Sequence, residues 1–232
     1  CYEGTLISVF NHNDVWYVTT RRCLNAKDST WVTGNSYYDM FTEAMKNIFT
    51  FDELNKNFCY HFVLVHNKNR NIVSYTWLGK DYAELFHVMT TEKYTLKEVT
   101  HQINKNVRAV DEVEFPSLQD LQNDLTTQNS TDIKYQKVTT EGYILRYYTG
   151  DVHNSPFINM KLQTDIYKTL MNLKPNNSNI HQCFLELYQQ DKLNEFLPFF
   201  TRYGGEIVRR IHESMKNIAK EEGVSVAELA SI

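Results

Sequence analysis

Residues 140–147 of the chain read Thr140-Glu141-Gly142-Tyr143-Ile144-Leu145-Arg146-Tyr147. A β-rich run that follows a carboxylate and a glycine predicts a strand whose first residues face a functional site. Glycine allows backbone or ligand to approach closely, and a glutamate beside it can face a metal ion or a cation. A turn glycine beside a solvated glutamate produces the same pattern, so the interpretation depends on other parts of the chain.

The composition is that of a folded protein without a strong overall charge. The 232 residues include 15 Tyr and 13 Phe but only 8 Gly and 4 Pro, and the net charge is −4. These values favour a packed core over disordered arms. They also exclude nucleic-acid binding through bulk charge, so any contact with RNA requires a locally basic surface.

Cysteine usage and hydropathy bear on where the protein works. The four cysteines have no C-x-x-C spacing, which is typical of a reduced, intracellular protein. No apolar run is long enough to cross a membrane, and no signal peptide is recognisable, so we expect no membrane partner. Because the first residue is Cys1 and not Met, we expect that residues upstream of it are missing.

Local patterns predict strands first and helices later. Short β-rich runs bounded by turn residues predict strands at residues 6–10, 15–20, 57–65 and 71–77. Capping residues and apolar periodicity predict helices at residues 36–48, 96–104, 117–125, 165–171, 181–189 and 205–222, with a last one after Ser225. Residues 128–132 have the composition of a polar loop. This order predicts an α+β fold with helices at its C-terminal end.

Four motifs occur in an order that is typical of one superfamily. They are Glu3-Gly4-Thr5, the link Asn69-Arg70-Asn71-Ile72-Val73 between two predicted strands, the segment from Glu141 to Arg146, and Asn159-Met160-Lys161. In these motifs the chain resembles the covalent nucleotidyltransferases, which are the RNA ligases, DNA ligases and mRNA capping enzymes. It is similar in particular to phage-type RNA ligase 1 and its relatives in large DNA viruses. The resemblance covers residues 1–161, and more loosely the helical tail.

The resemblance implies both a fold and an activity. The fold is a nucleotidyltransferase-like antiparallel β core with flanking helices in residues 1–164, and a C-terminal helical subdomain in residues 165–232. The activity is that of an ATP-dependent RNA ligase that joins or repairs RNA ends through a nucleotidylated enzyme intermediate. ATP and Mg²⁺ are the implied cofactors, and the partners are a nucleotide and RNA ends, with no obligate protein partner. The implied location is the cytoplasm, with a viral replication site as the alternative.

Three residues align with the catalytic positions of the family. The first motif, K-x-[DE]-G, supplies the lysine that becomes nucleotidylated, and Cys1 stands at that position. Glu141 matches the glutamate of the fourth motif, which helps to hold a metal ion and to orient the lysine. Lys161 matches the second lysine of the fifth motif. A lysine must lose a proton to attack phosphorus, and cations offset the charge of the phosphates.

Seven further residues are implied contacts of the nucleotide. Arg21 and Arg22 follow the second predicted strand, where a pair of solvated arginines is the alternative interpretation. His61 and Asn159 replace, respectively, a ribose-binding glutamate of the third motif and the first lysine of the fifth. The remaining members of this set are Glu3, Gly4 and Arg146.

The departures at Cys1, His61 and Asn159 leave three functions open. The chain is an active ligase with a divergent nucleophile, either Cys1 or a lysine elsewhere; or it is an inactive nucleotide- or RNA-binding module; or it is a protein-interaction scaffold. If one of the first two is correct, the side chains of one site should converge. We predict this convergence for Cys1, Glu3, Arg21, His61, Glu141 and Lys161.

Overall fold

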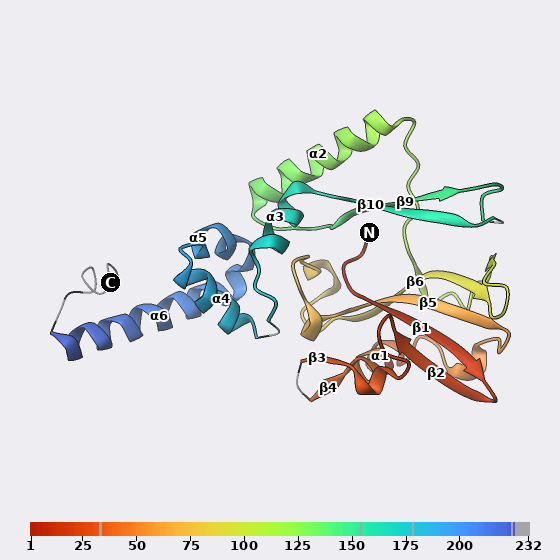
Figure 1. Ribbon diagram of the computed structural model, residues 1–232, viewed down its shortest axis with the longest axis horizontal. Helices are drawn as coiled ribbons and strands as arrows, with labels where there is room; N and C mark the ends of the chain where they lie inside the picture. The colour runs from red at the N-terminus through yellow and green to blue at the C-terminus, as the bar shows by residue number, and fades with distance from the viewer. Residues whose placement is uncertain (33, 154, 178, 224, 226–232) are drawn as a thin grey trace. The chain divides into compact units, whose positions relative to one another are not determined.

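The computed structural model of the chain describes residues 1–32, 34–153, 155–177, 179–223 and 225 (Figure 1). It consists of two compact units, Cys1–Lys168 and Thr169–Ile232. Antiparallel sheets and several helices make the architecture α+β, which confirms the predicted class. The helix predicted after Ser225 falls on residues 226–232 and lies outside the described residues.

The first unit is built on a sheet with the strand order β2-β1-β5-β6-β7, and β8 pairs with β6. Its strands are β1 (Thr5–His12), β2 (Val15–Thr20), β5 (Phe58–His66), β6 (Ala83–Glu92), β7 (Glu98–Val99) and β8 (Arg108–Ala109). All pairs are antiparallel except β6 with β8. The β1–β2 turn holds Asn13 and Asp14 at φ 48° and 61°, the left-handed conformation that two-residue hairpins require.

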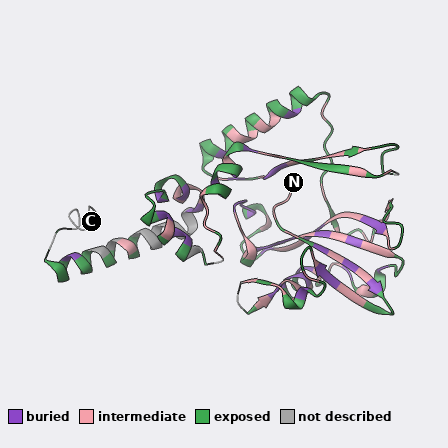
Figure 2. Ribbon diagram, viewed as in Figure 1, coloured by how far each residue is buried: buried purple, intermediate pink, exposed green. Residues whose placement is uncertain are grey.

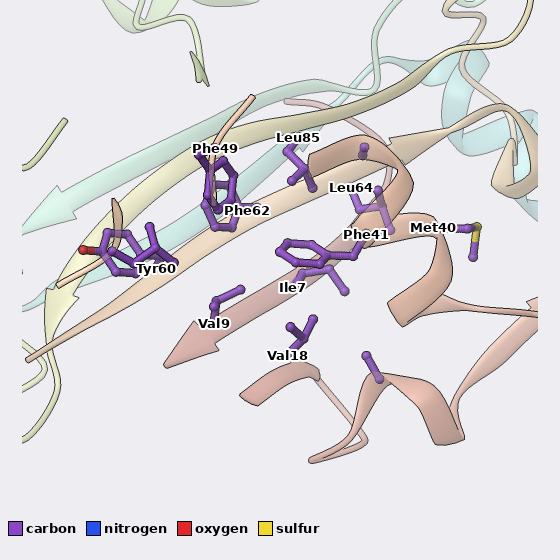
Figure 3. Close-up of a cluster of buried hydrophobic side chains, with 13 residues drawn as sticks. Ile7, Val9, Val18, Met40, Phe41, Phe49, Tyr60, Phe62, Leu64 and Leu85 are labelled. Atoms are coloured by element: carbon purple, nitrogen blue, oxygen red, sulfur yellow. The ribbon is translucent and has the colours of Figure 1, made fainter. Parts of the chain in front are cut away.

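One face of this sheet is covered by α1 (Tyr37–Met45), as Figure 1 shows. The helix begins with a capping box, in which the Asp39 N–H donates to Ser36 Oγ at 3.1 Å and the Ser36 N–H donates to Asp39 Oδ2 at 3.0 Å. Its apolar side and the inward residues of the strands form the core (Figures 2 and 3), whose largest members include Ile7, Met40, Phe41, Tyr60, Phe62, Leu64 and Leu85. A small hairpin, β3 (Thr30–Val32) and β4 (Asn35–Ser36), precedes α1.

The predicted strand at residues 71–77 and the predicted helix at residues 96–104 are both wrong. The first segment contains only a short 3₁₀ helix, Thr76–Leu78, because the backbone N–H groups of Ile72 and Val73 donate to the carboxylate of Glu3 instead of to a neighbouring strand. The second begins as β7, which extends the sheet beside β6. The strand β6 itself was not predicted from the sequence.

Helix α2 (Leu118–Tyr135) is longer than predicted, so the predicted loop at 128–132 is wrong as well. Ser117 caps it as expected, through a 3.2 Å bond from the Asp120 N–H. In its polar middle, four hydroxyl groups donate to carbonyls one turn earlier, at 2.8–2.9 Å, so these side chains bond within the helix. The fully buried Asp132 then accepts the N–H and the hydroxyl of Thr139, which holds the chain after the helix.

A second, two-stranded sheet lies on the side of the main sheet away from α1 (Figure 1) and is formed by β9 (Gly142–Tyr148) and β10 (Phe157–Gln163). Strand alternation places Arg146, Asn159 and Lys161 on one face, because Asn159 is directly opposite Arg146 and Lys161 is opposite Ile144. Arg146 directs this face toward β6 and β7, since it donates to Glu98 Oε1 at 2.9 Å and to Val88 O at 3.5 Å.

The second unit is helical. The chain enters it through α3 (Asp165–Leu173) and continues as α4 (Ile180–Gln189), α5 (Leu193–Phe196), a 3₁₀ segment (Leu197–Phe200) and α6 (Thr201–Glu222). Phe184, Phe196 and Phe200 form its aromatic centre, with the last two rings stacked 4.4 Å apart. The predicted helices at 165–171, 181–189 and 205–222 are confirmed. No helix among the described residues is both long and apolar enough to cross a membrane.

Gly142 provides a direct test of how closely β9 and β10 pack. It has φ +135°, and a Cβ there would collide with Leu162 O and lie 2.9 Å from Gln163 Cα. We expect Gly142→Ala to lower the free energy of unfolding by about 3 kcal/mol or more in urea titrations. The control is Gly34→Ala, which has φ +83° but meets no described atom within 4 Å, and should cost about 1 kcal/mol. Equal losses would contradict the close packing.

The partly buried His87 is expected to make the stability of the first unit sensitive to acid. Burial lowers its pKa to about 4, and the charges of His61 and His101 add to this. Because the folded pKa lies below the unfolded value, stability is complete above pH 6.5 and declines as the pH falls toward 4. Allowing for partial exposure, we expect a loss of about 2 kcal/mol between pH 7 and 4.5. In urea titrations, His87→Gln should reduce this loss, whereas the exposed control His12→Gln should not. An unchanged pH dependence in His87→Gln would exclude the effect.

Candidate functional site

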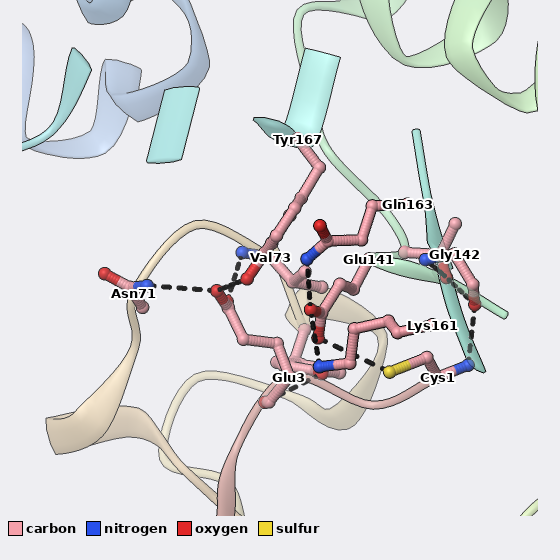
Figure 4. A network of polar contacts seen from close by, with 11 residues as sticks. Cys1, Glu3, Asn71, Val73, Glu141, Gly142, Lys161, Gln163 and Tyr167 are labelled. Atoms are coloured by element: carbon pink, nitrogen blue, oxygen red, sulfur yellow. Dashed lines mark hydrogen bonds and ion pairs between the residues drawn. The ribbon is translucent and has the colours of Figure 1, made fainter. Parts of the chain in front are cut away.

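Glu141, which directly precedes β9, is the centre of a buried polar cluster (Figure 4). Only 4% of its surface is exposed. Its Oε1 accepts hydrogen bonds from Lys161 Nζ at 2.8 Å and Gln163 Nε2 at 2.7 Å. Its Oε2 accepts one from Cys1 Sγ at 3.4 Å. The three residues assigned to catalytic positions therefore meet at one carboxylate, although Cys1 is 140 residues from Glu141 and Lys161 is 20 residues from it along the chain.

Backbone contacts hold these three residues in place. The backbone nitrogen of Cys1 donates to Gly142 O at 2.7 Å, and the Gly142 N–H donates to Thr140 Oγ1 at 3.1 Å. Lys161 and Gln163 are two residues apart on β10, so their side chains leave the same face of the strand. That face is turned to Glu141 because Gln163 is paired directly with Gly142.

Glu3 is the second carboxylate of the cluster, and its oxygens are occupied by protein groups. Oε2 accepts the backbone N–H groups of Ile72 at 2.9 Å and Val73 at 2.7 Å. Oε1 accepts Asn71 Nδ2 at 3.1 Å and the hydroxyl of Tyr167 at 2.8 Å. In this structure the carboxylate of Glu3 thus ties the start of the chain to residues 71–73 and to α3.

The charge of Glu141 acts on Glu3, and both carboxylates act on Tyr167. Burial raises the pKa of Glu3 and the charge of Glu141 raises it further, while the hydrogen bonds to Val73, Ile72 and Tyr167 act in the opposite direction. Burial, followed by the charges of Glu3 and Glu141, also raises the pKa of Tyr167 far above its ordinary value. The Tyr167 hydroxyl therefore stays protonated and remains a donor at any physiological pH.

Gly4 allows β1 to start where it does. A Cβ at this position would collide with Leu64 O and lie 2.7 Å from Val63 Cγ1 on β5. The glycine of the first motif is thus explained by close approach of two backbones. No contact with a ligand is needed to account for it.

His61 lies on the sheet face opposite the core, where it is paired with Ser8 of β1. Its ring bonds to Ser8 Oγ through Nδ1 at 2.9 Å and to Thr91 Oγ1 through Nε2 at 3.2 Å. Burial lowers its pKa, so the ring is neutral at pH 7. Both nitrogens are engaged by hydroxyl groups of the sheet, and its contacts are separate from those of Glu141.

The remaining predicted residues are distributed around the first unit. Arg146 is paired with Glu98 and lies 5.0 Å from the ring centre of Phe157. Asn159 is exposed on the same face as Lys161. Arg21 and Arg22 are exposed in the turn after β2, and the hydrogen bonds around Glu3 and Glu141 involve neither of them. The structure therefore brings Cys1, Glu3, Glu141 and Lys161 together, while the arginines after β2 take no part in that network.

The cluster does not form a metal site by itself. Among the described residues no group of three or more His, Cys, Asp or Glu side chains is gathered as metal binding would require. Glu141 is the residue implied to hold Mg²⁺, yet its oxygens already accept Lys161, Gln163 and Cys1. Mg²⁺ usually takes one or two carboxylates together with phosphate oxygens of a substrate. The protein residues alone therefore do not fit a resident ion.

Gln163 and Tyr167 are members of the cluster that sequence reasoning missed. Gln163 could have been found, because a residue two positions after Lys161 in a strand shares its face. Tyr167 carries no comparable signal, since its partner Glu3 is 164 positions away. No protein-family model matches the chain, and none of the curated proteins matches it. The family resemblance therefore stays a prediction that depends on the motifs.

Replacing Glu3 tests whether its carboxylate holds the first unit together. In Glu3→Gln, an amide NH₂ would replace one of two oxygens that each accept two donors. We expect a loss of about 2–4 kcal/mol in the free energy of unfolding, measured by urea titration. The matched control Glu43→Gln alters a carboxylate that is half exposed and paired with His66 and Lys68, and should cost under about 1 kcal/mol. Equal effects would show that the Glu3 contacts contribute little.

Proposed function

We propose that the first unit is an RNA ligase-like nucleotidyltransferase domain that binds ATP and transfers its nucleotidyl group toward an RNA end. The observation that carries this proposal is the meeting of Cys1, Glu141 and Lys161 at one buried carboxylate. These are the positions that the motif resemblance assigns to catalysis, and they are 20 and 140 residues apart along the chain. A scaffold that only binds protein has no evident need for such a cluster.

The charges of the cluster support binding of an anionic ligand. Lys161 is half exposed while the carboxylate of Glu141 is buried, so the ammonium group is the part that an incoming ligand would meet. A lysine in this position is a compact point charge suited to phosphate. Asn159, two residues earlier on the same face, adds a neutral amide that could donate to a phosphate or ribose oxygen.

Cys1 contacts a carboxylate, which does not favour it as a nucleophile. Its sulfur donates a hydrogen bond to Glu141 Oε2 at 3.4 Å. The thiolate is the nucleophilic form of cysteine, and an adjacent carboxylate opposes its formation. The enzyme hypothesis therefore requires another group to attack the nucleotide, whereas the binding-module hypothesis requires none.

Labelling with a nucleotide separates these functions. The protein is incubated with ATP labelled at the α-phosphate and Mg²⁺, denatured, and examined for bound label. We expect covalent labelling of the wild type and a loss of roughly a hundred-fold or more in Glu141→Gln, because that change removes the carboxylate that could accept a proton. The control Glu43→Gln should label like the wild type.

Two other outcomes would replace this proposal. Reversible ATP binding without covalent label, measured by calorimetry, would identify the chain as an inactive nucleotide-binding module. Absence of both label and binding would favour the scaffold.

A further inference from the structure

We propose that β10 is a pairing edge, through which two copies of the chain join their β10 strands antiparallel across a two-fold axis at Met160. The inference concerns an interaction surface and does not depend on the proposed function. Among the described strands, β9 and β10 pair only with each other. The outer edges of such a sheet present unpaired backbone groups, and a two-stranded sheet gains stability when further strands extend it.

The sheet of β9 and β10 turns an apolar face outward. The face that carries Arg146, Asn159 and Lys161 is directed toward β6 and β7. By strand alternation, the opposite face is composed only of uncharged side chains, those of Tyr143, Leu145, Tyr147, Ile158, Met160 and Leu162. Tyr147, Ile158 and Met160 are 60–69% exposed. Exposed apolar side chains gathered in this way indicate a surface at which another protein element packs.

Burial and contacts identify β10, and not β9, as the open edge. The consecutive residues 158–161 of β10 are all exposed, whereas in β9 only Ile144 and Tyr147 are exposed (Figure 2). The start of the chain meets the edge of β9, because the backbone nitrogen of Cys1 donates to Gly142 O at 2.7 Å. A further strand therefore has access to β10.

Hydrogen bonds at the two ends of the hairpin show which backbone groups face this edge. The Thr149 N–H donates to Pro156 O at 2.9 Å, and the Thr164 N–H donates to Glu141 O at 3.1 Å. Residues of an antiparallel strand face their partner and face away from it in turn, so the even-numbered residues from 156 to 164 face β9. The groups that point to the open edge are the N–H and C=O of Phe157, Asn159, Lys161 and Gln163.

Strand β10 lacks the features that protect edge strands from pairing. It contains no proline, and its register with β9 runs from Phe157 to Gln163 without a bulge. Lys161 is its only charged residue, and the ammonium group contacts Glu141 at 2.8 Å instead of lying along the edge. Within β10, pairing with another strand therefore meets neither a missing donor nor a free charge.

The sequence of β10 is complementary to a second copy of itself. If Met160 lies opposite Met160, then Asn159 of each strand lies opposite Lys161 of the other. Phe157 lies opposite Gln163 in the same way, so all the outward N–H and C=O groups find partners. A shift of two residues in either direction leaves an outward residue of each strand unpaired, and one of these shifts also opposes the two Lys161 side chains. The complementary register thus selects a second copy as the occupant.

The interface expected from this pairing is small. A strand of the length of β10 extends over roughly 23 Å, and the contact adds main-chain bonds and one row of apolar side chains. Stable complexes bury roughly 800 Å² on each partner. We therefore expect weak association, with a dissociation constant on the order of 10–100 µM. Assembly should end at two copies, because a two-fold contact is closed.

A cysteine cross-link in the full chain tests the register. The two Met160 Cα atoms would lie about 4.5 Å apart, within the roughly 4.4–6.8 Å that a disulfide spans. With oxidised glutathione, Met160→Cys should give about ten-fold more disulfide-linked dimer on a non-reducing gel than the wild type, which has free cysteines of its own. The control is Ile158→Cys, whose counterpart would lie about 13 Å away along the strand and out of reach.

Sedimentation velocity tests the association without a cross-link. The wild type should shift from the 27.4 kDa monomer toward a dimer as its concentration rises from about 1 to 300 µM. Asn159→Pro removes an outward N–H that β9 does not use, and should weaken association roughly ten-fold or more. Asn159→Ala keeps that N–H and should associate like the wild type. Circular dichroism shows whether Asn159→Pro is folded, and the cross-link remains decisive if it is not.

Three results would overturn the inference. They are a wild type that stays monomeric at every concentration, a folded Asn159→Pro that dimerises as well as Asn159→Ala, and equal cross-linking of Met160→Cys and Ile158→Cys. Masses beyond that of a dimer would also contradict it, because they would show open-ended association instead of a closed two-fold contact.

Discussion

The first unit depends on the burial of one carboxylate, that of Glu3. A buried carboxylate is tolerated only when its oxygens accept hydrogen bonds, and Glu3 finds four donors. Three come from residues 71–73 and the fourth is the hydroxyl of Tyr167. Satisfying this single charge therefore fixes where the start of the chain, the segment after β5 and the beginning of α3 lie relative to each other.

That arrangement determines the electrostatics of the neighbouring cluster. Glu141 is buried close enough to Glu3 for its charge to raise the pKa of Glu3. Two nearby carboxylates repel each other, and the repulsion is offset here by Lys161, whose amine contacts Glu141 at 2.8 Å. Glu141 is buried while Lys161 is half exposed, so the position of Lys161 on β10 partly offsets the cost of burying the charge of Glu141. The polar cluster is thus part of the architecture as well as a candidate for chemistry.

Local features were predictable from the sequence, and long-range ones were not. The Ser36 cap and the Asn13–Asp14 turn depend only on neighbouring residues, so the local sequence is enough to predict them. The strand expected at 71–77 does not form, because the backbone N–H groups of Ile72 and Val73 donate to the carboxylate of Glu3, which is distant in sequence. The prediction for the middle of α2 was wrong for another reason. Its polar composition is typical of a loop, yet the hydroxyl groups of these side chains bond within the helix. The meeting of Cys1, Glu141 and Lys161 was expected from motif resemblance alone, since no local pattern encodes it.

The pairing of Lys161 with Glu141 also constrains how a nucleotide could bind. In the structure described, the ammonium group neutralises the carboxylate, so a triphosphate must draw Lys161 away from Glu141 or share it. Arg146 cannot readily take over this role, because it is held by Glu98 and packs over Phe157. Under the proposed function, a phosphate that contacts Lys161 would therefore compete with the existing ion pair to Glu141, which would limit the affinity for nucleotide.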